Sequence, residues 1–222
     1  MRFGKLPALC LATSLAGAIA LGAATVADAC SRLLYETGTG SYIVARSMDW
    51  NDPTAKTSLW LFPQGMQRDG GLGDKPVTWT SKHGSVIASF YDAASVDGIN
   101  DKGLMGNVLY LAESDYGDAA KTGKPTISIG AWLQYFLDNY ATVKEAVAAM
   151  QDSPFTVVAP VLPNGRPASG HLSLADSSGD SAVFEYLDGK LVIHHGSEYC
   201  VMTNSPTFDQ QLALDPYWQP VS

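Results

Sequence analysis

The sequence predicts an α+β domain, because its apolar pattern changes period twice. Up to residue 111, short β-branched and aromatic runs alternate with glycine-rich turns, which predicts strands at 30–35, 41–46, 57–62, 77–80, 85–90 and 104–111. Apolar residues then recur at helical spacing over 126–140, and a second helix is expected at 143–150. After Pro154 the β pattern returns, at 156–161, 171–176, 182–187, 191–194 and 198–203. This order predicts antiparallel sheets with helices packed outside them.

Turn and capping residues justify the boundaries of these elements. Thr142 and Glu145 have the spacing of a capping box at the start of the second helix. Asp188-Gly189 is typical of a two-residue hairpin turn. The glycine-rich stretch 69–74 predicts a loop, and 98–103 predicts a tight turn before the buried strand 104–111.

Residues 1–29 have the features of a secretory signal peptide. A basic head is followed by an apolar run at 9–26, and Ala27 and Ala29 form a small-x-small cleavage site. Cleavage after Ala29 would make Cys30 the first residue of a secreted or periplasmic protein. Two alternatives stay open, namely an uncleaved membrane anchor and a lipoprotein that carries a diacylglycerol on the Cys30 sulfur.

Composition limits the classes of partner. The formal net charge is −8, and removal of residues 1–29 with Arg2, Lys5 and Asp28 would make it one unit more negative. We therefore expect no nucleic acid as a partner, and no membrane after signal cleavage. Residues 30–222 are enough for a single domain. The four histidines lack zinc-site spacing, so we expect no metal or other cofactor.

Cys30 is the candidate nucleophile. A cysteine at a free N-terminus holds a thiol with a pKa of about 8.5 and an amine with a pKa of about 7.7–8.0, so the amine can accept the thiol proton near neutral pH. Arg46 could favour the thiolate, and Asp49 could orient the α-ammonium group. The alternative for this pair is a salt bridge at a strand end. Asn204 could donate to an oxyanion, or it could simply cap the turn before Pro206.

Five segments in this order resemble the choloylglycine hydrolase family, which contains bile salt hydrolases and penicillin V acylases. They are the Ala29–Cys30 junction, RSMD at 46–49, GINDKGL at 98–104, HLSLAD with GDSA over 171–182, and MTNSPTF at 202–208. The resemblance covers the whole predicted mature chain. It implies a four-layer αββα N-terminal-nucleophile hydrolase sandwich and hydrolysis of linear amides.

The resemblance also implies roles for site residues. Cys30 matches the family's nucleophile, Arg46 and Asp49 match its paired arginine and aspartate, and Asn204 matches its oxyanion-hole asparagine. Tyr110 would supply the second oxyanion donor from its backbone N–H. It stands where bile salt hydrolases commonly carry Asn and many penicillin V acylases carry Tyr, which weakly favours a substrate other than bile salts.

The acyl group is left open by the sequence. Penicillin V, conjugated bile acids and N-acyl homoserine lactones all remain candidate small-molecule amide substrates. Trp50 and Tyr110 are candidates for an apolar acyl pocket, as are Trp60 and Phe62, and the alternative for each is ordinary core. The alternative function is a lipid-anchored or catalytically inactive binding protein with the same fold. A homo-oligomer also stays open.

The family's late catalytic arginine has no counterpart in the 222 residues. Four residues near the end need an apolar surface to pack against, namely Leu212, Leu214, Tyr217 and Trp218. We therefore expect residues 30–222 to be a partial hydrolase domain, poorly soluble and nearly inactive by itself.

Two cysteines remain after the predicted cleavage, and export favours a Cys30–Cys200 disulfide. If Asn204 lies beside Cys30, however, Cys200 is four residues back along a strand, about 13 Å away. Disulfides need Cα atoms within about 7 Å. We therefore predict two free thiols, with Cys200 buried on the strand face that carries Met202.

Overall fold

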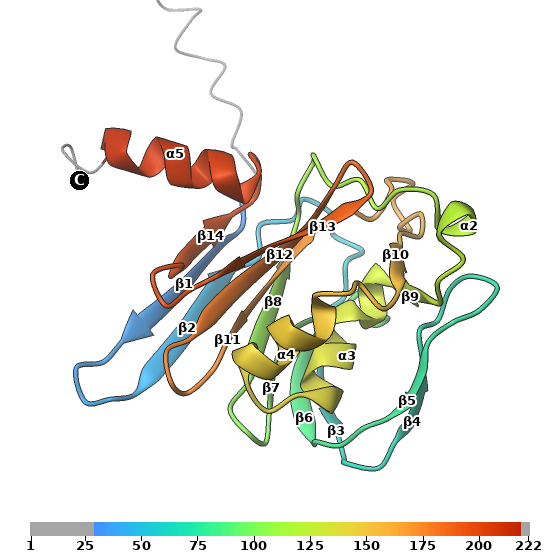
Figure 1. Cartoon of the computed structure of the whole chain (residues 1–222), viewed down its shortest axis with the longest axis horizontal. Coiled ribbons are helices and arrows are strands. Elements are labelled where there is room, and N and C mark those ends of the chain that lie inside the picture. Colours follow the sequence, from blue (N-terminus) through green and yellow to red (C-terminus); the bar gives the residue numbers. More distant parts are fainter. Residues whose placement is uncertain (1–28, 219–222) are drawn as a thin grey trace, which may run out of the picture.

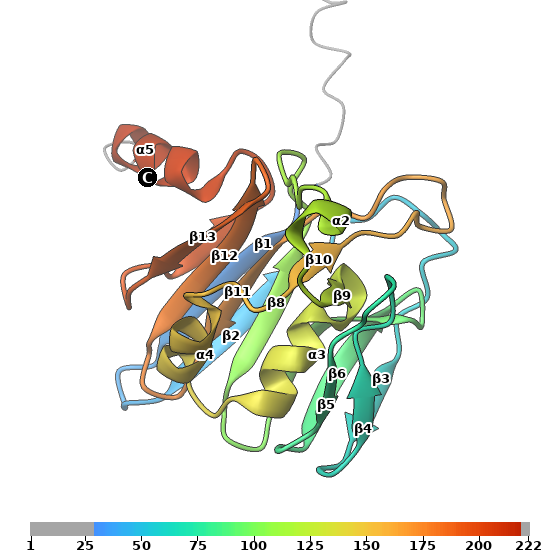
Figure 2. The same ribbon diagram turned by 45° about the vertical axis from the view of Figure 1, so that its right-hand side comes forward.

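The computed structural model describes residues 29–218 of the 222-residue chain. The predicted signal peptide thus lies outside the described residues, apart from Ala29. The described part contains two antiparallel sheets lying against each other, with the two central helices on one side (Figures 1 and 2). No helix within residues 29–218 has the length and apolar character needed to cross a membrane.

The larger sheet has seven strands in the order β13-β12-β11-β8-β7-β6-β3, and every neighbouring pair is antiparallel. In chain order the strands are β3 (Leu59–Phe62), β6 (Ser85–Phe90), β7 (Ala94–Asn100), β8 (Met105–Leu109), β11 (His171–Ala175), β12 (Ser181–Leu187) and β13 (Lys190–His195).

The smaller sheet joins the two ends of the described chain. It consists of β1 (Ser31–Glu36) between β2 (Tyr42–Ser47) and β14 (Val201–Thr203), both antiparallel to it. Two further strand pairs are separate from both sheets: β4 (Gln67–Asp69) with β5 (Thr78–Thr80), and the parallel pair β9 (Thr126–Ser128) and β10 (Thr156–Val158). Because β1 and β14 pair, Cys30 and the corner after Thr203 are brought together.

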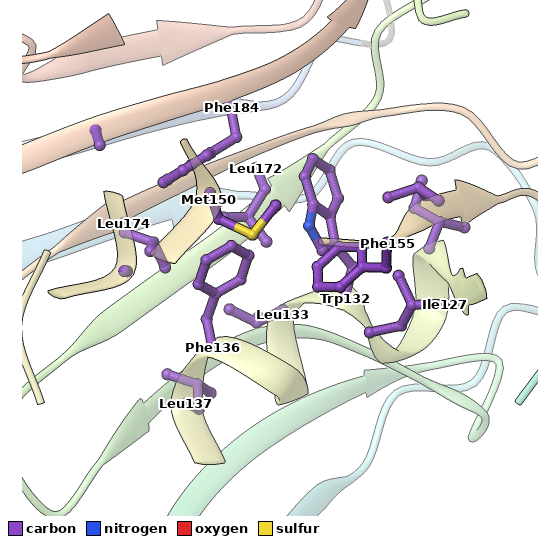
Figure 3. Packing of buried hydrophobic residues seen from close by; sticks show 14 of the residues in the cluster. Ile127, Trp132, Leu133, Phe136, Leu137, Met150, Phe155, Leu172, Leu174 and Phe184 are labelled. Carbon is purple, nitrogen blue, oxygen red and sulfur yellow. The ribbon is translucent and has the colours of Figure 1, made fainter. Parts of the chain in front are cut away.

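The main hydrophobic core lies between the larger sheet and helices α3 (Ile129–Asn139) and α4 (Val143–Met150) (Figure 3). Side chains at helical spacing on α3, among them Trp132, Leu133 and Phe136, are fully buried there. Two paired glycines allow the close approach of α3. A Cβ on Gly106 would lie 2.3 Å from Leu133 Cδ1, and one on Gly98 would lie 2.8 Å from Leu137 Cδ1.

The opposite face of the larger sheet packs against the smaller sheet. Leu109, Val183, Met202 and Phe208 form a second buried cluster there with Cys30. Both faces of β11 and β12 are therefore covered, which explains why all five residues of β11 are buried. Within residues 29–218 the layers run helices, larger sheet, smaller sheet. The outer face of the smaller sheet is open to solvent, and its exposed apolar side chains are Leu33, Tyr35, Ile43 and Val201.

The structure confirms the predicted α+β class and the two central helices, and it corrects several boundaries. The turn predicted at 98–103 is wrong over its first half, because β7 continues to Asn100. The first helix begins at Ile129 rather than at 126, since 126–128 forms β9. The strand β4 and the short helix α2 (Ala119–Thr122) carry little apolar periodicity and were not predicted. The final segment forms helix α5 (Phe208–Trp218).

Candidate active site

Cys30 lies directly before β1, at the end of the smaller sheet, and only 3% of it is exposed. Its carbonyl accepts a hydrogen bond from Thr203 Oγ1 at 2.8 Å, which fixes the residue against β14. Its thiol lies 4.0 Å from the Asp49 carbonyl oxygen and 3.7 Å from Arg46 Nη2. The predicted nucleophile is therefore held beside a cation at the rim of the inter-sheet core.

Arg46 is the cation predicted to act on Cys30, and the structure places it there. Its Nη2 also donates to the Val108 carbonyl at 3.1 Å, and its Nη1 forms an ion pair with Asp97. Asn107 Nδ2 in turn donates to Asp97 Oδ1 at 2.8 Å. These contacts tie β2 to β7 and β8 across the two sheets, so the guanidinium has a fixed position relative to the thiol.

The expected contact of Asp49 with the α-ammonium group stays a prediction, whereas the alternative of a surface salt bridge between Arg46 and Asp49 is wrong. The ion-pair partner is Asp97, which sequence reasoning missed, since an acid inside a strand 51 residues away gives no local signal. The Asp49 side chain instead accepts a hydrogen bond from Ser47 Oγ at 3.1 Å. Asp49 still contributes its backbone carbonyl to the surroundings of the Cys30 thiol.

Asn204 faces both Cys30 and Tyr110. In the orientation that satisfies both groups, its Oδ1 accepts from the Cys30 backbone nitrogen at 3.3 Å, and its Nδ2 donates to the Tyr110 carbonyl at 3.2 Å. Three predicted site residues, from directly before β1, directly after β8 and the corner after β14, are thus brought together. The alternative that Asn204 only caps a turn is insufficient, because its side chain contacts two distant segments.

An apolar pocket opens beside the Cys30 thiol. Its volume is about 110 Å³, and its lining includes Trp50, Phe90, Val96, Tyr110 and Leu162. Trp50 packs edge-on against Phe90 with ring centroids 5.5 Å apart. The structure thus places both predicted pocket residues, Trp50 and Tyr110, at the pocket wall.

The orientation of Trp50 is fixed by two residues that were not predicted. Its indole N–H donates to the Tyr91 hydroxyl at 3.1 Å, and that hydroxyl donates to Asp52. This hydrogen bond from Tyr91, followed by those from Thr54, lowers the pKa of the Asp52 carboxyl. Trp60 and Phe62, the two other pocket candidates, pack against the helix-side core instead, so the core alternative was right for them.

Cys30 and Cys200 are both free thiols, as predicted. The expectation that Cys200 is buried on a strand face is wrong. Cys200 precedes β14, is partly exposed, and donates its S–H to the Ser197 carbonyl at 3.2 Å. Met202 and Asn204, which were expected to share a strand face with Cys200, are buried, at 0% and 9% exposed. Within residues 29–218, no three His, Cys, Asp or Glu side chains are grouped so that they could hold a metal ion.

Comparison with known sequences gives the family. The pattern described as "Linear amide C-N hydrolases, choloylglycine hydrolase family" matches residues 30–222. The chain belongs to the choloylglycine hydrolase family. The family resemblance noted in the sequence is thereby confirmed over the part of the chain that carries the site.

Two curated relatives match the chain over most of its length. The chain is 54% identical to a penicillin V acylase of Pectobacterium atrosepticum over 213 residues, which cover 92% of this chain. It is 26% identical to a bile salt hydrolase/transferase of Clostridium perfringens over 186 residues, or 83% of this chain. The matched part spans 56% of the length of each of these relatives.

Solved structures of this family have the same fold. A penicillin V acylase from Agrobacterium tumefaciens superposes with a TM-score of 0.78 at 52% identity, covering 87% of this chain and 58% of that one. A variant of the conjugated bile acid hydrolase from Clostridium perfringens gives a TM-score of 0.70 at 25% identity, covering 85% and 57%. The predicted N-terminal-nucleophile hydrolase fold is thus confirmed for the described residues.

Proposed function

We propose that this chain carries the nucleophile of an exported amidase that hydrolyses N-acyl compounds through a thioester on Cys30. The observation that carries the proposal is the placement of the Cys30 thiol. It lies at the mouth of an apolar pocket, 3.7 Å from Arg46 Nη2, with the Asn204 side chain bridging Cys30 and Tyr110. An apolar acyl group in the pocket would present its carbonyl carbon to the sulfur.

In the proposed acylation step, every bond and proton is accounted for by Cys30 and the substrate, so the step needs no cofactor. Cys30 Sγ bonds to the carbonyl carbon, and the thiol proton passes to the α-amine. The carbonyl oxygen becomes an oxyanion that accepts from the Tyr110 backbone N–H and from Asn204 Nδ2. A side-chain amide has two N–H groups, so Nδ2 can donate to the Tyr110 carbonyl and to the oxyanion.

Collapse of the oxyanion breaks the C–N bond, and the α-ammonium group protonates the departing amine. Water then cleaves the thioester, with the α-amine accepting its proton. The contact between Asn204 Oδ1 and the Cys30 nitrogen supports this arrangement, because the same nitrogen becomes the amine once residues 1–29 are removed.

For the acyl group we propose a flat aryl unit such as phenoxyacetyl. The pocket volume of about 110 Å³ is of the same order as an apolar cavity of about 150 Å³ that binds benzene. Its wall includes Trp50, Phe90 and Tyr110, which suit edge-to-face contacts with an aromatic ring. The greater identity to a penicillin V acylase than to a bile salt hydrolase supports the same choice.

The first test concerns the N-terminus. Mass spectrometry of the protein exported from its host should find Cys30 as an unmodified first residue. A diacylglycerol on the Cys30 sulfur would support the lipid-anchored alternative and block the nucleophile. An intact residue 1–29 segment would support the uncleaved membrane anchor and remove the proposed general base.

The second test measures amine release by the protein exported from its host, with penicillin V, a glycine-conjugated bile acid and an N-acyl homoserine lactone as substrates. We expect the kcat/KM for penicillin V to exceed the other two by about tenfold or more. Cys30→Ser should abolish turnover, because a hydroxyl is a poorer nucleophile than a thiolate at neutral pH. Cys200→Ser is the matched control and should retain full activity. Turnover by Cys30→Ser within a few-fold of the parent would refute the assignment.

A further inference from the structure

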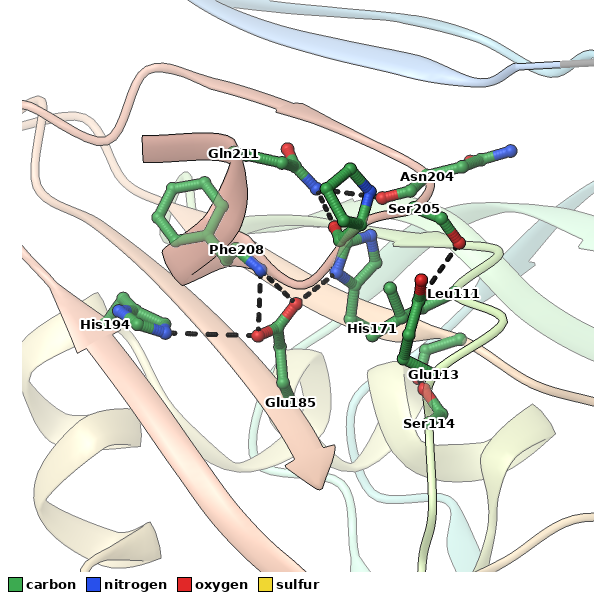
Figure 4. Close-up of polar contacts among 12 residues, drawn as sticks. Leu111, Glu113, Ser114, His171, Glu185, His194, Asn204, Ser205, Phe208 and Gln211 are labelled. Carbon is green, nitrogen blue, oxygen red and sulfur yellow. Dashed lines mark hydrogen bonds and ion pairs between the residues drawn. The ribbon is translucent and has the colours of Figure 1, made fainter. Parts of the chain in front are cut away.

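The side-chain amide of Gln211, in the first turn of α5, hydrogen-bonds to the main chain of the corner that carries Asn204. Its Nε2 lies within hydrogen-bond distance of the Asn204 carbonyl at 2.8 Å, the Pro206 carbonyl at 2.7 Å and the Thr203 carbonyl at 3.3 Å. Its Oε1 accepts from the Thr203 N–H at 3.1 Å. A single side chain thus contacts the main chain on both sides of Asn204, and Figure 4 shows its contact with Asn204 itself.

The start of α5 is itself anchored to the larger sheet. Both oxygens of the Glu185 carboxylate on β12 accept from the Phe208 N–H, at 3.0 and 3.1 Å. The same carboxylate contacts His171 Nδ1 at 2.8 Å, and Glu185 and His171 are both fully buried (Figure 4). The carboxylate also suits the positive end of the helix. Gln211 therefore extends from a helix whose first residue is fixed to the larger sheet.

The other side of the corner is tied to the segment that follows Tyr110. Ser205 Oγ accepts from the Ala112 N–H at 3.2 Å and donates to Glu113 at 2.7 Å. These contacts lie at exposed residues, so they restrain the corner less firmly than Gln211 does.

We propose that Gln211 is a positioning residue that sets the Asn204 side chain relative to Cys30 and Tyr110. The proposal rests on the proposed function, because it assigns Gln211 to the oxyanion site of that reaction. A misplacement of about 1 Å can cost about 100-fold in rate. The amide is required because it combines a donor for carbonyls with an acceptor for the Thr203 N–H.

The test uses Gln211→Glu, which keeps the shape and the acceptor but replaces the donor by a carboxylate facing three carbonyls. Gln211→Met, of similar length and without polar atoms, is a second variant in case the charge prevents folding. Gln210→Ala is the matched control, since Gln210 is the same residue type at the preceding, exposed position of α5.

Both Gln211 variants should lower kcat about 10- to 100-fold with KM within about twofold, somewhat less than the loss of an oxyanion donor itself. The rate of Cys30 alkylation by iodoacetamide should change by less than about twofold, because alkylation forms no oxyanion. Hydrogen exchange at the Thr203 amide should become faster in Gln211→Met, which removes the acceptor of that N–H. Gln210→Ala should match the parent in all three measurements. An unchanged kcat, or a fall in kcat with an equal fall in alkylation rate, would overturn the proposal.

Failure of the proposed function has a different signature, namely no amine release by the parent from any amide. In that case the positioning role of Gln211 is tested by the affinity of the protein for phenoxyacetaldehyde. Cys30 Sγ adds to the aldehyde carbon, the C=O π bond opens and the thiol proton passes to the α-amine. The former carbonyl oxygen then takes the place of the oxyanion. An affinity about tenfold weaker in Gln211→Glu, with alkylation unchanged, supports the positioning role. Equal affinity in parent and variant contradicts it.

Discussion

Replacement of Arg32 by methionine should stabilise the protein, although it removes a side chain with three hydrogen-bond contacts. Arg32 points between the two sheets, where it is 1% exposed. Its Nη1 donates to Ser181 Oγ and to the carbonyls of Tyr199 and Cys200, at 3.2–3.4 Å. Its Nε and Nη2 have no hydrogen-bond partner within residues 29–218.

The expected size of the effect follows from the burial of this charge. Burial lowers the pKa of the Arg32 guanidinium to about 10, and attraction to Cys200 only partly opposes this. Since an ordinary arginine titrates near or above about 12.5, the buried charge costs about 3 kcal/mol. The acceptors keep other donors, because the Cys200 carbonyl also binds the Leu34 N–H and the Tyr199 carbonyl also binds Ser181 Oγ. We therefore expect Arg32→Met to gain about 1–3 kcal/mol in the free energy of unfolding.

The assay is urea unfolding at pH 7.5, followed by circular dichroism, with Lys144→Met on the exposed side of α4 as the control. The control should change the free energy of unfolding by less than about 0.5 kcal/mol. Arg32→Met should also raise Tm, by about 2–4 °C per kcal/mol for a chain of this size. A loss of more than about 1 kcal/mol in Arg32→Met would show that the guanidinium is net stabilising, and the reasoning would fail.

The same replacement makes a prediction about pH. The pKa of Arg32 is lower in the folded than in the unfolded chain, so the unfolded chain binds more protons above pH 10. The cost of the buried charge is therefore complete below pH 10 and decreases as the pH rises above it. The advantage of Arg32→Met should be constant between pH 7 and 9 and should shrink at pH 10.5 and above.

Three other replacements test separate parts of the structure. Asp97→Asn should destabilise the protein by about 1–3 kcal/mol and lower kcat, because it leaves the largely buried Arg46 side chain without its ion-pair partner. An unchanged kcat would show that Arg46 needs no such anchor. Gly106→Ala should cost at least about 1–3 kcal/mol in urea unfolding, since the new Cβ would overlap Leu133 Cδ1; a neutral result would mean that α3 can shift. Tyr91→Phe should raise KM for aryl amides more than it lowers kcat, because it removes the hydrogen-bond acceptor of the Trp50 indole N–H. An unchanged KM would contradict a role of Tyr91 in the pocket.

Much of the fold could be predicted from the sequence because its signals are local. The helical spacing over 129–140 and the capping box at Thr142 and Glu145 gave both central helices, and the structure has Glu145 N–H donating to Thr142 Oγ1. The Asp188-Gly189 turn gave the hairpin of β12 and β13. The errors arose where local signals conflict. Gly98, for example, is typical of a turn, yet it lies inside β7 because only a glycine leaves room for Leu137.

The candidate site divides in the same way between sequence and structure. Cys30, Arg46, Tyr110 and Asn204 were found from the sequence, because a signal-peptide junction and family-like motifs mark them. The residues that hold these side chains in place could not be predicted from the sequence. Asp97, Tyr91 and Gln211 are ordinary polar residues in a strand, a turn and a helix.

Only the pairing of distant strands gives these partners their roles. Asp97 is 51 residues from Arg46 in the chain, and Tyr91 is 41 residues from Trp50. The sequence by itself determined which groups can do chemistry, because nucleophile, cation and amide are properties of residue types. The tertiary structure decided which of them meet and how firmly each is held, because those distances depend on how two sheets and α5 pack together.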